Sequence, residues 1–261
     1  MTYQFCTVDR QGPLTVVTIN RPEVMNALHP PANQELAEVF DAFAADPDQW
    51  VAIITGAGDR AFSAGNDLRF QAENQGRLTI PPAGFGGLTS RFDLAKPVIA
   101  AVNGVAMGGG FEIALASDII IADEKAIFAL PEPRVGLAAL AGGLHRLPRI
   151  IGETRAMGMI LTGRRVGAEE GERLGFVNAV APAGTALEVA KTWAAQILEC
   201  GPMSIRASKD AVKRGLAEPS VEAAVKAQNG YPAVAALYRS EDFVEGPKAF
   251  AEKRAPQWKG R

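Results

Sequence analysis

Cysteine and histidine are scarce in this chain. Among 261 residues there are two cysteines, Cys6 and Cys200, and two histidines, His29 and His145. A disulfide framework is therefore not expected. Two isolated histidines and two distant cysteines give no cluster with metal-ligand spacing, so we expect no metal site. The low cysteine content is typical of a reducing cytoplasm, where we expect the protein to be.

The chain also lacks an excess of either charge and lacks long apolar runs. It has 27 Lys and Arg residues against 29 Asp and Glu residues, a formal net charge of −2. This balance gives no basic surface, so we expect no nucleic-acid partner. No stretch approaches the roughly 18 to 20 consecutive apolar residues of a membrane-spanning helix. Asp9 and Arg10 stand where a secretory signal would need an apolar run, so we expect neither a signal nor a membrane partner.

The chain does contain enough apolar material for a sizeable core, since 48% of its residues are hydrophobic. β-branched runs predict strands at residues 14–19 and 50–55, and helical spacing predicts a helix at residues 31–46 between them. This alternation favours an α/β fold with parallel strands. From about residue 186 the patterns are helical with almost no strand signal. We therefore divide the chain into a core, residues 1–200, and a helical region, residues 201–261.

Three consecutive glycines, Gly108 to Gly110, precede a strongly apolar segment in "NGVAMGGGFEIALASD". Glycine allows backbone amides to come close to a ligand, and a helix that begins there directs the positive end of its dipole at the same point. A dinucleotide fingerprint needs a third glycine where this chain has Ile113, and a phosphate loop needs a lysine after the glycines. The glycines therefore indicate backbone approach to a reacting oxygen, or a tight strand-to-helix turn alone.

A serine hydrolase is another alternative. The segment "AFSAG", residues 61–65, approaches the nucleophile-elbow pattern, but Ala61 replaces its first glycine. The triad also needs a histidine placed after the serine in the chain. His29 precedes Ser63, and His145 lies in "GGLHRLPR" at an expected helix start, so the sequence argues against a triad.

Two acids remain as candidates for proton transfer. Glu112 lies in the first turn of the glycine-led helix among apolar neighbours, and Glu132 stands between two prolines in "FALPEPRVG". Glu112 could simply compensate the helix dipole, and Glu132 could be a solvated loop residue. Their apolar surroundings favour burial instead. Burial raises the pKa of a carboxyl toward the range that suits general acid–base catalysis.

Taken together, these segments resemble the crotonase, or enoyl-CoA hydratase/isomerase, superfamily. The resemblance is carried in order along nearly the whole chain by "NRPEVMNAL", "VAIITGAGDRAFSAGNDL", "KPVIAAVNGVAMGGGFEIALASDIIIADEKAIFALPEPRVG", "LTGRRVGAEEGERLGFVNAV" and "FAEKR". Within it, "TGRRVGAEE" and the ending "YRSEDFVEGPKAFAEKRAPQWKGR" are most similar to the carnitinyl-CoA dehydratase (crotonobetainyl-CoA hydratase) branch. Where that branch has a Val-Pro-Asp-Ser type of segment near the acyl pocket, this chain has "LAALAGG", residues 137–143.

The resemblance implies an α/β fold and a site. The fold is a catalytic spiral of ββα turns followed by helices that pack trimers, often doubled to hexamers. In the family a thioester carbonyl lies between two backbone amides, which by position belong to Asn66 and Gly109, and the acids Glu112 and Glu132 hold one water. Most relatives have alanine or another residue at position 66, which a backbone donor tolerates. The implied coenzyme A contacts are Ala61, Ser63, Ala64, Gly65, Asp67, Leu68, Gly108 and Lys253, the last reaching a neighbouring subunit's ligand.

The function implied by the resemblance is an enoyl-CoA hydratase or dehydratase. This hydro-lyase adds water reversibly to an α,β-unsaturated acyl-CoA thioester, which is crotonobetainyl-CoA or a short to medium enoyl-CoA. Glu112 is assigned as base and Glu132 as acid/base, and family isomerases often lack one of the two. No metal or redox cofactor is implied, because coenzyme A is part of the substrate. The alternatives are a Δ3-Δ2-enoyl-CoA isomerase and a non-catalytic scaffold with this fold.

The acyl pocket is expected beneath a loop rich in glycine and proline, "TIPPAGFGGLTS", residues 79–90. Phe85 and Leu88 are the candidates in this loop for lining the pocket, and simple loop packing accounts for them equally well. A quaternary ammonium group would need an aromatic cage or a nearby acid. With three Trp and three Tyr in the chain, partners for such a cage are scarce.

Overall fold

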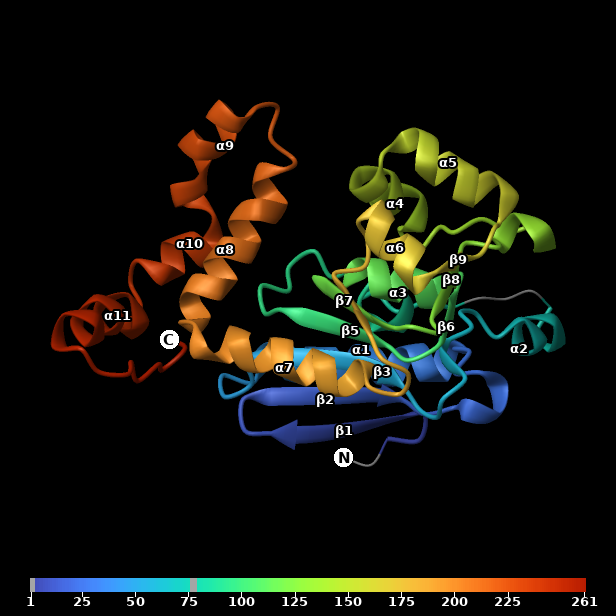
Figure 1. Cartoon of the computed structure of the whole chain (residues 1–261), viewed down its shortest axis with the longest axis horizontal. Helices are drawn as coiled ribbons and strands as arrows, with labels where there is room; N and C mark the ends of the chain where they lie inside the picture. Colours follow the sequence, from blue (N-terminus) through green and yellow to red (C-terminus); the bar gives the residue numbers. More distant parts are fainter. Residues whose placement is uncertain (1–2, 76–78) are drawn as a thin grey trace.

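A six-stranded sheet forms the base of the molecule (Figure 1) in this computed structural model, which describes residues 3–75 and 79–261. The first two residues of the N-terminal segment and residues 76–78 of the glycine-rich region lie outside these ranges. In spatial order the strands are β1 (Cys6–Gln11), β2 (Leu14–Ile19), β3 (Val51–Gly56), β5 (Val98–Val102), β7 (Ile119–Asp123) and β10 (Ala179–Ala181). β1 and β2 form an antiparallel hairpin, and the other neighbouring pairs are parallel. The predicted α/β fold is therefore confirmed, with the hairpin as an addition.

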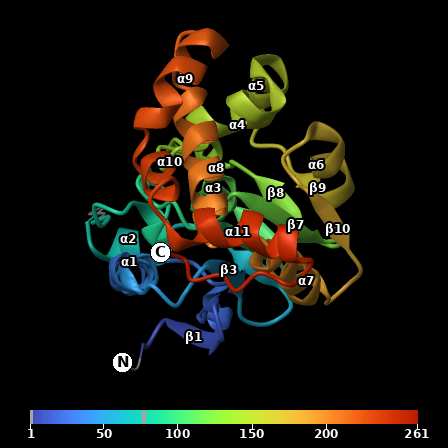
Figure 2. The same cartoon turned by 90° about the vertical axis from the view of Figure 1, so that its left-hand side faces the viewer.

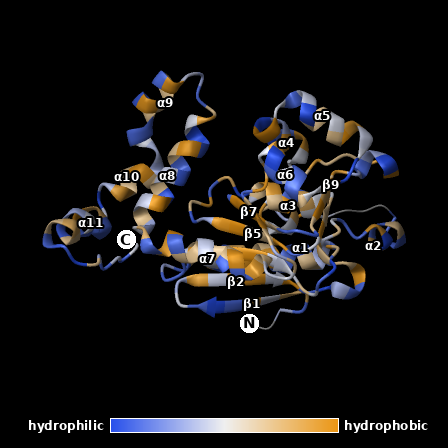
Figure 3. Ribbon diagram, in the orientation of Figure 1, coloured by the Kyte–Doolittle hydropathy of each residue, from blue (hydrophilic) through white to orange (hydrophobic). Residues whose placement is uncertain are grey.

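Burial explains which of these strands could be recognised in the sequence. Every residue of β3 and β5 is buried, as expected for parallel strands covered by helices on both faces. In β1 only Cys6 is buried, and Figure 3 shows much of this edge strand in blue while β5 and β7 are orange. β2 has the predicted bounds. β1 and β10 were not predicted, because the first is polar and the second has only three residues.

A smaller sheet alternates with the large one along the chain. Its strands, in spatial order, are β4 (Ala61–Ser63), β6 (Val105–Met107), β8 (Ile127–Ala129) and β9 (Val166–Gly167). β4, β6 and β8 are parallel, and β9 joins β8 antiparallel. The chain passes from β3 to β4, from β5 to β6 and from β7 to β8. The helices α2 (Leu68–Glu73) and α3 (Gly109–Ala116) and the 3-10 turn η3 (Glu132–Val135) follow these pairs, which gives the predicted ββα spiral.

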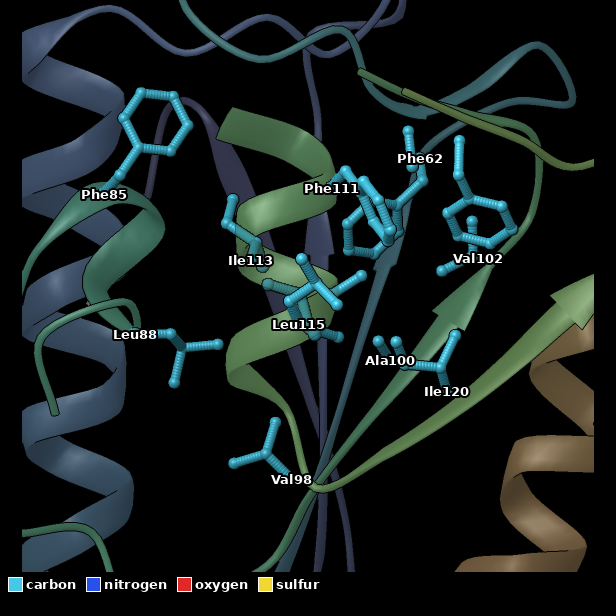
Figure 4. Close-up of a cluster of buried hydrophobic side chains, with 14 of the residues drawn as sticks. Phe62, Phe85, Leu88, Val98, Ala100, Val102, Phe111, Ile113, Leu115 and Ile120 are labelled. Atoms are coloured by element: carbon cyan, nitrogen blue, oxygen red, sulfur yellow. The ribbon is translucent and has the colours of Figure 1, made fainter. Parts of the chain in front are cut away.

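Helices cover both faces of the large sheet. α1 (Pro30–Ala45) and α3 pack on one face, against alternate residues such as Ile54 and Ala100. α7 (Ala186–Glu199) lies across the other face, where its alanines meet Ile53 and Ile99. This division follows from the two-residue period of a strand. Figure 4 shows the apolar side chains of α3, including Phe111, among those of the neighbouring strands.

The remaining elements lie above the sheets and in an extended C-terminal arm (Figures 1 and 2). Above the small sheet are α4 (Gly143–Ile151), α5 (Glu153–Thr162) and α6 (Ala168–Leu174). The arm contains α8 (Pro202–Gly215), α9 (Val221–Ala227), α10 (Pro232–Leu237) and α11 (Glu241–Glu252). Short 3-10 turns complete the fold: η1 (Pro22–Val24), η2 (Phe85–Gly87) and η4 (Gln228–Gly230). Within the two described ranges, no helix has the length and apolar character needed to cross a membrane.

The C-terminal arm is fixed to the core by polar contacts and exposes apolar side chains. Lys209 of α8 donates to Asp118 Oδ2 at 2.6 Å and to the Lys96 carbonyl at 2.7 Å. At the far end, the indole of Trp258 donates to the Glu199 carbonyl. The exposed apolar residues of the arm include Val212, Leu216, Val221, Val225, Val244 and Phe250. Such exposure is typical of surfaces that bind another protein chain.

Candidate active site

Three consecutive turns of the spiral bring their functional segments to one edge of the small sheet. β4, β6 and β8 are parallel neighbours, so their carboxyl ends lie side by side. Asn66 follows β4, the glycine triplet follows β6, and Glu132 follows β8. Ligands of parallel α/β sheets bind at the carboxyl ends of strands. This edge is therefore the candidate site.

The backbone amide of Asn66 is held free by a parallel bridge to Leu28. The Leu28 amide donates to the Gly65 carbonyl at 2.7 Å, and the Asp67 amide donates to the Leu28 carbonyl at 3.0 Å. In a parallel bridge, the residues before and after one partner make the hydrogen bonds to the other partner. The amide of Asn66 itself therefore points away from Leu28. It donates to no acceptor within the described part of the chain. The Asn66 side chain points aside and donates to Gln71 of α2 at 2.5 Å.

The amide of Gly109 lies against the same loop. Gly109 is the first residue of α3, where backbone amides have no partner inside the helix, and residues 3–75 and 79–261 offer it no other acceptor. A Cβ on Gly65 would lie 2.9 Å from the Gly109 nitrogen and 2.5 Å from the Met107 carbonyl oxygen. With φ at +86°, Gly65 also needs a conformation that favours glycine. The two segments that carry the free amides are therefore packed against each other.

Glu112 lies buried in the first turn of α3, with 3% of its surface exposed. The Gly143 amide, at the start of α4, donates to Glu112 Oε1 at 2.8 Å. Burial raises the pKa of Glu112 to about 7, and the nearby charge of Glu132 adds to this effect. The amides of Gly143 and Ala141 and the charge of Arg146 act in the opposite direction. Glu112 can therefore exchange a proton near neutral pH.

Glu132 lies beside the glycine triplet, where Pro131 and Pro133 flank it at the start of η3. A Cβ on Gly108 would lie 2.7 Å from Glu132 Oε1, so the missing side chain makes room for the carboxyl. Its other oxygen, Oε2, is buried and has no hydrogen-bond partner among the residues that the structure describes. Burial raises the pKa of this carboxyl as well. The charge of Glu132 in turn raises the pKa of Glu112.

Most of the predicted coenzyme A contacts lie in the turn at residues 61–68, and they differ in burial and in hydrogen bonding. Ser63 donates its hydroxyl to the Asn26 carbonyl at 2.8 Å and accepts the Gly65 amide at 3.1 Å. The Ser63 hydroxyl is therefore buried and stabilises the turn, so it is not exposed as a nucleophile would be. Asp67 accepts the Phe70 amide at the start of α2 and pairs with Arg21 at 3.0 Å. Ala61 is buried in β4, Ala64 and Asp67 are half-buried, and Leu68 is exposed.

Lys253 is not brought to the site within one chain. It is exposed at the end of α11, which lies at the other end of the molecule from α2 (Figure 1). Phe85 and Leu88, the candidates for lining an acyl pocket, are buried in the main core (Figure 4). The Phe85 ring covers Gly109, because a Cβ there would meet the ring at 2.5 Å. The Phe85 ring therefore lies beside one of the two free amides.

The chain matches one family over almost its whole length. The model of the family described as enoyl-CoA hydratase/isomerase covers residues 9–261. The chain belongs to the enoyl-CoA hydratase/isomerase family. The predicted superfamily is thereby confirmed.

Individual members of the enoyl-CoA hydratase/isomerase family are similar to this chain over nearly its whole length. Carnitinyl-CoA dehydratases of Citrobacter koseri and Shigella flexneri are 45% and 46% identical to this chain, over 97% of each chain in both cases. The crystal structure of an enoyl-CoA hydratase from Mycobacterium tuberculosis H37Rv has a TM-score of 0.91 at 37% identity, over 98% of this chain and 99% of that one. A carnitinyl-CoA hydratase from Mycobacterium avium has a TM-score of 0.78 at 39% identity, over all of both chains. These names agree with the predicted hydro-lyase class.

Sequence reasoning missed three features of this family member. Gly143 and Arg146 act on Glu112, although the sequence indicated only that Gly143 lies near the acyl pocket and that a helix starts near His145. A pocket of about 480 Å³ also borders Met107 and Pro131 and is lined by arginines 134, 164 and 165. The one sequence feature that could have indicated this pocket is the arginine pair in "TGRRVG". Arg134 binds the Thr162 carbonyl and Arg164 pairs with Glu170, so much of this positive charge already has partners.

Proposed function

We propose that this chain catalyses the reversible addition of water to an α,β-unsaturated acyl-CoA thioester. The observation that supports the proposal is that two free amides, the buried Glu112 and the half-buried Glu132 lie at one sheet edge. Hydration needs both sets of groups. The amides stabilise charge on the thioester oxygen, and the acids move the protons.

The proposed oxyanion donors are the amides of Asn66 and Gly109. When water attacks the β-carbon, negative charge develops on the thioester oxygen and an enolate-like state forms. Donors fixed before the reaction stabilise this charge as it develops, and loss of one typically costs about 3 kcal/mol of barrier. The N-terminus of α3 adds its dipole at the same point.

The proposed proton transfers use Glu112 as base and Glu132 as acid. The oxygen of water forms a bond to the β-carbon while Glu112 takes its proton. The electrons of the double bond move to the thioester oxygen and return as Glu132 gives its proton to the α-carbon. A proton passing from Glu112 to Glu132 restores the starting state, and the reverse sequence is dehydration. Every step uses groups of the chain and of the substrate, so the proposal includes no separate cofactor.

Coenzyme A is proposed to lie along residues 61–68 and Gly108. In that segment Ala64 and Gly65 directly precede Asn66, Leu68 is exposed two residues after it, and Ala61 and Ser63 belong to β4. Lys253 lies far from this strip in one chain, so we propose that it binds the coenzyme A phosphates of a neighbouring subunit.

The proposed assembly is a homotrimer or a dimer of trimers, formed through residues 201–261. Leu216 and Phe250 of the arm are 84% and 87% exposed, and contact with other copies would cover such side chains. Phe250 shares the last turn of α11 with Lys253, so the same contact would present that lysine. A cytoplasmic location is part of the proposal, because both cysteines are free.

The substrate class is proposed from the relatives named carnitinyl-CoA dehydratase. The test is a panel of enoyl-CoA and 3-hydroxyacyl-CoA thioesters, including crotonobetainyl-CoA, with absorbance of the conjugated thioester as readout. Hydration lowers this absorbance. A Δ3-Δ2 isomerase would instead raise it when given a 3-enoyl thioester, and a scaffold would change neither.

The roles of the acids are tested by Glu112→Gln, Glu132→Gln and the double variant. Each single change should lower kcat by about a hundredfold or more, as expected for loss of a general acid or base. Glu172→Gln, at an exposed position of α6, is the matched control and should keep wild-type activity. Full activity in the double variant would refute the assignment.

A further inference from the structure

Arg146 is a half-buried cation beside the candidate site that no step of the proposed reaction uses. It lies near the start of α4, three residues after Gly143. Within residues 3–75 and 79–261, no carboxylate forms an ion pair with it. A guanidinium in a half-buried position has a desolvation cost that no ion pair offsets here, so its contacts need an explanation.

The guanidinium of Arg146 connects two separate segments. Its Nη2 donates to the Thr89 carbonyl at 2.8 Å, and Nη1 makes a longer contact of 3.5 Å to the Ala141 carbonyl. The Arg146 Cζ lies 5.4 Å from the ring centroid of Phe92. A Cβ on Gly142 would lie 2.1 Å from Nη1, so the backbone is shaped to admit the group. Arg146 thus joins the turn at 141–143 to the loop at 89–92.

Each of these two segments is connected to a different group of the candidate site, one to the Gly109 amide and the other to Glu112. The loop positions Phe85, because the Phe85 amide donates to the Thr89 hydroxyl at 2.8 Å and the Phe85 ring covers Gly109. The turn positions Glu112, because the Gly143 amide donates to its carboxylate. Arg146 is therefore the link between the segment over one free amide and the segment that holds the first acid.

We propose that Arg146 is a positioning residue that keeps Glu112 in register with the Gly109 amide and supplies the cationic charge nearest to Glu112. This inference rests on the proposed role of Glu112. Arg146 has no part in proton transfer, and it acts through the turn at 141–143 and through its charge.

The charges that face Glu112 come from two elements. Glu132 of η3 is the acid that acts on it, and Arg146 of α4 is the cation. The other elements in close contact with α3 are β4, β5, β6 and η2, and none contains an ionisable side chain. His145 and Arg149 of α4 are exposed, and Arg149 donates to the His145 carbonyl of its own helix. Among the residues that the structure describes, Arg146 is the one cation whose charge acts on Glu112.

The sign of the effect follows from these charges. Glu112 must be ionised to act as base, and burial with Glu132 nearby favours its protonated form. The Arg146 charge opposes them by favouring the carboxylate. Its removal should raise the pKa of Glu112, so activity should be lost mainly on the acidic side of the pH profile.

The experiment compares Arg146→Met, Arg146→Lys and Arg149→Met with wild type, in the full-length enzyme. The pH dependence of kcat and KM for an enoyl-CoA substrate is measured, together with the Glu112 titration by NMR of 13C-labelled glutamate carboxyls. The signal of Glu112 is the one absent from Glu112→Gln.

In Arg146→Met we expect the acidic limb and the Glu112 titration to move up together by about one pH unit, which is about a tenfold loss of rate below neutral pH. Arg146→Lys keeps the charge, so the Glu112 titration should lie close to that of wild type, although lysine lacks the planar donor set of arginine. Arg149→Met should shift neither, and KM should change little in any variant.

Two results would overturn the inference. One is a folded Arg146→Met variant with an unmoved Glu112 titration. The other is a loss of rate that is equal at every pH, which would indicate a structural role alone. If the wild type turned over no enoyl thioester, the proposed function would fail. The NMR titration would still test whether Arg146 acts on Glu112. If Arg146→Met did not fold, Arg146→Gln, which also removes the charge but keeps a hydrogen-bond donor, takes its place. An unmoved Glu112 titration in that variant would overturn the inference.

Discussion

Replacing Glu112 with glutamine should stabilise the protein above neutral pH while it removes activity. Burial holds the pKa of Glu112 at about 7, against 4.5 for an ordinary glutamate. The folded state therefore binds this proton more tightly than the unfolded state does. The stability contributed by the protonated carboxyl is complete below pH 4.5 and is lost as the pH rises through 7. Glutamine has no proton to lose and can still accept the Gly143 amide.

The size of this effect follows from the separation of the two pKa values. A difference of roughly 2.5 units corresponds to about 3 kcal/mol, at 1.36 kcal/mol per unit. Relative to wild type, Glu112→Gln should therefore gain up to about 3 kcal/mol of unfolding free energy between about pH 4.5 and pH 8. This exceeds the effect of most surface substitutions, which lies within about 0.5 kcal/mol.

Urea unfolding at matched protein concentration measures this gain, with wild type, Glu112→Gln and the control Glu172→Gln compared at about pH 5 and about pH 8. The control removes one exposed negative charge from α6 without touching the site. A stability difference between Glu112→Gln and wild type that is the same at both pH values would refute the reasoning, because Glu112 would then not titrate between them.

Two further substitutions test the geometry of the site and of the assembly. Gly108→Ala places a Cβ 2.7 Å from Glu132 Oε1 at a φ of +53°, so kcat should fall by about a hundredfold. Steady-state kinetics with unchanged oligomeric state would show it, and a wild-type kcat would contradict the proposed place of Glu132. Lys253→Gln should raise KM for the acyl-CoA by about tenfold, the equivalent of roughly 1.4 kcal/mol of phosphate binding. Lys248→Gln, exposed on the same helix, should leave KM unchanged, and equal effects of the two would count against the role of Lys253.

The sequence predicted the burial of Glu112 but not what holds it. Its neighbours Phe111, Ile113 and Leu115 leave the helix no polar face, so burial of the acid followed from local composition. The donor at Gly143 lies 31 residues away, and no local pattern indicates which amide will reach Glu112. Contacts of this kind arise from the packing of α4 on α3, which the sequence does not display.

The short strands of the site were equally hard to predict. β4, β6 and β8 have three residues each, too few for a two-residue period to be read. Their parallel pairing nonetheless decides that Asn66, Gly109 and Glu132 meet. The family resemblance assigned these residues together, whereas periodicity alone found only the longer strands of the large sheet.

The carboxyl pair shows why such a site depends on distant segments. Burial alone would leave Glu112 protonated and unable to act as a base, and full hydration would leave it too weakly basic. The amides of the turn at 141–143 and the charge of Arg146 offset part of the burial effect and hold its pKa at about 7. The two amides lie in residues 137–143, where the chain departs from the sequence of the branch that it otherwise resembles, and Arg146 lies three residues beyond Gly143. Substitutions in the turn at 141–143 or at Arg146 can therefore change the pH range of the enzyme.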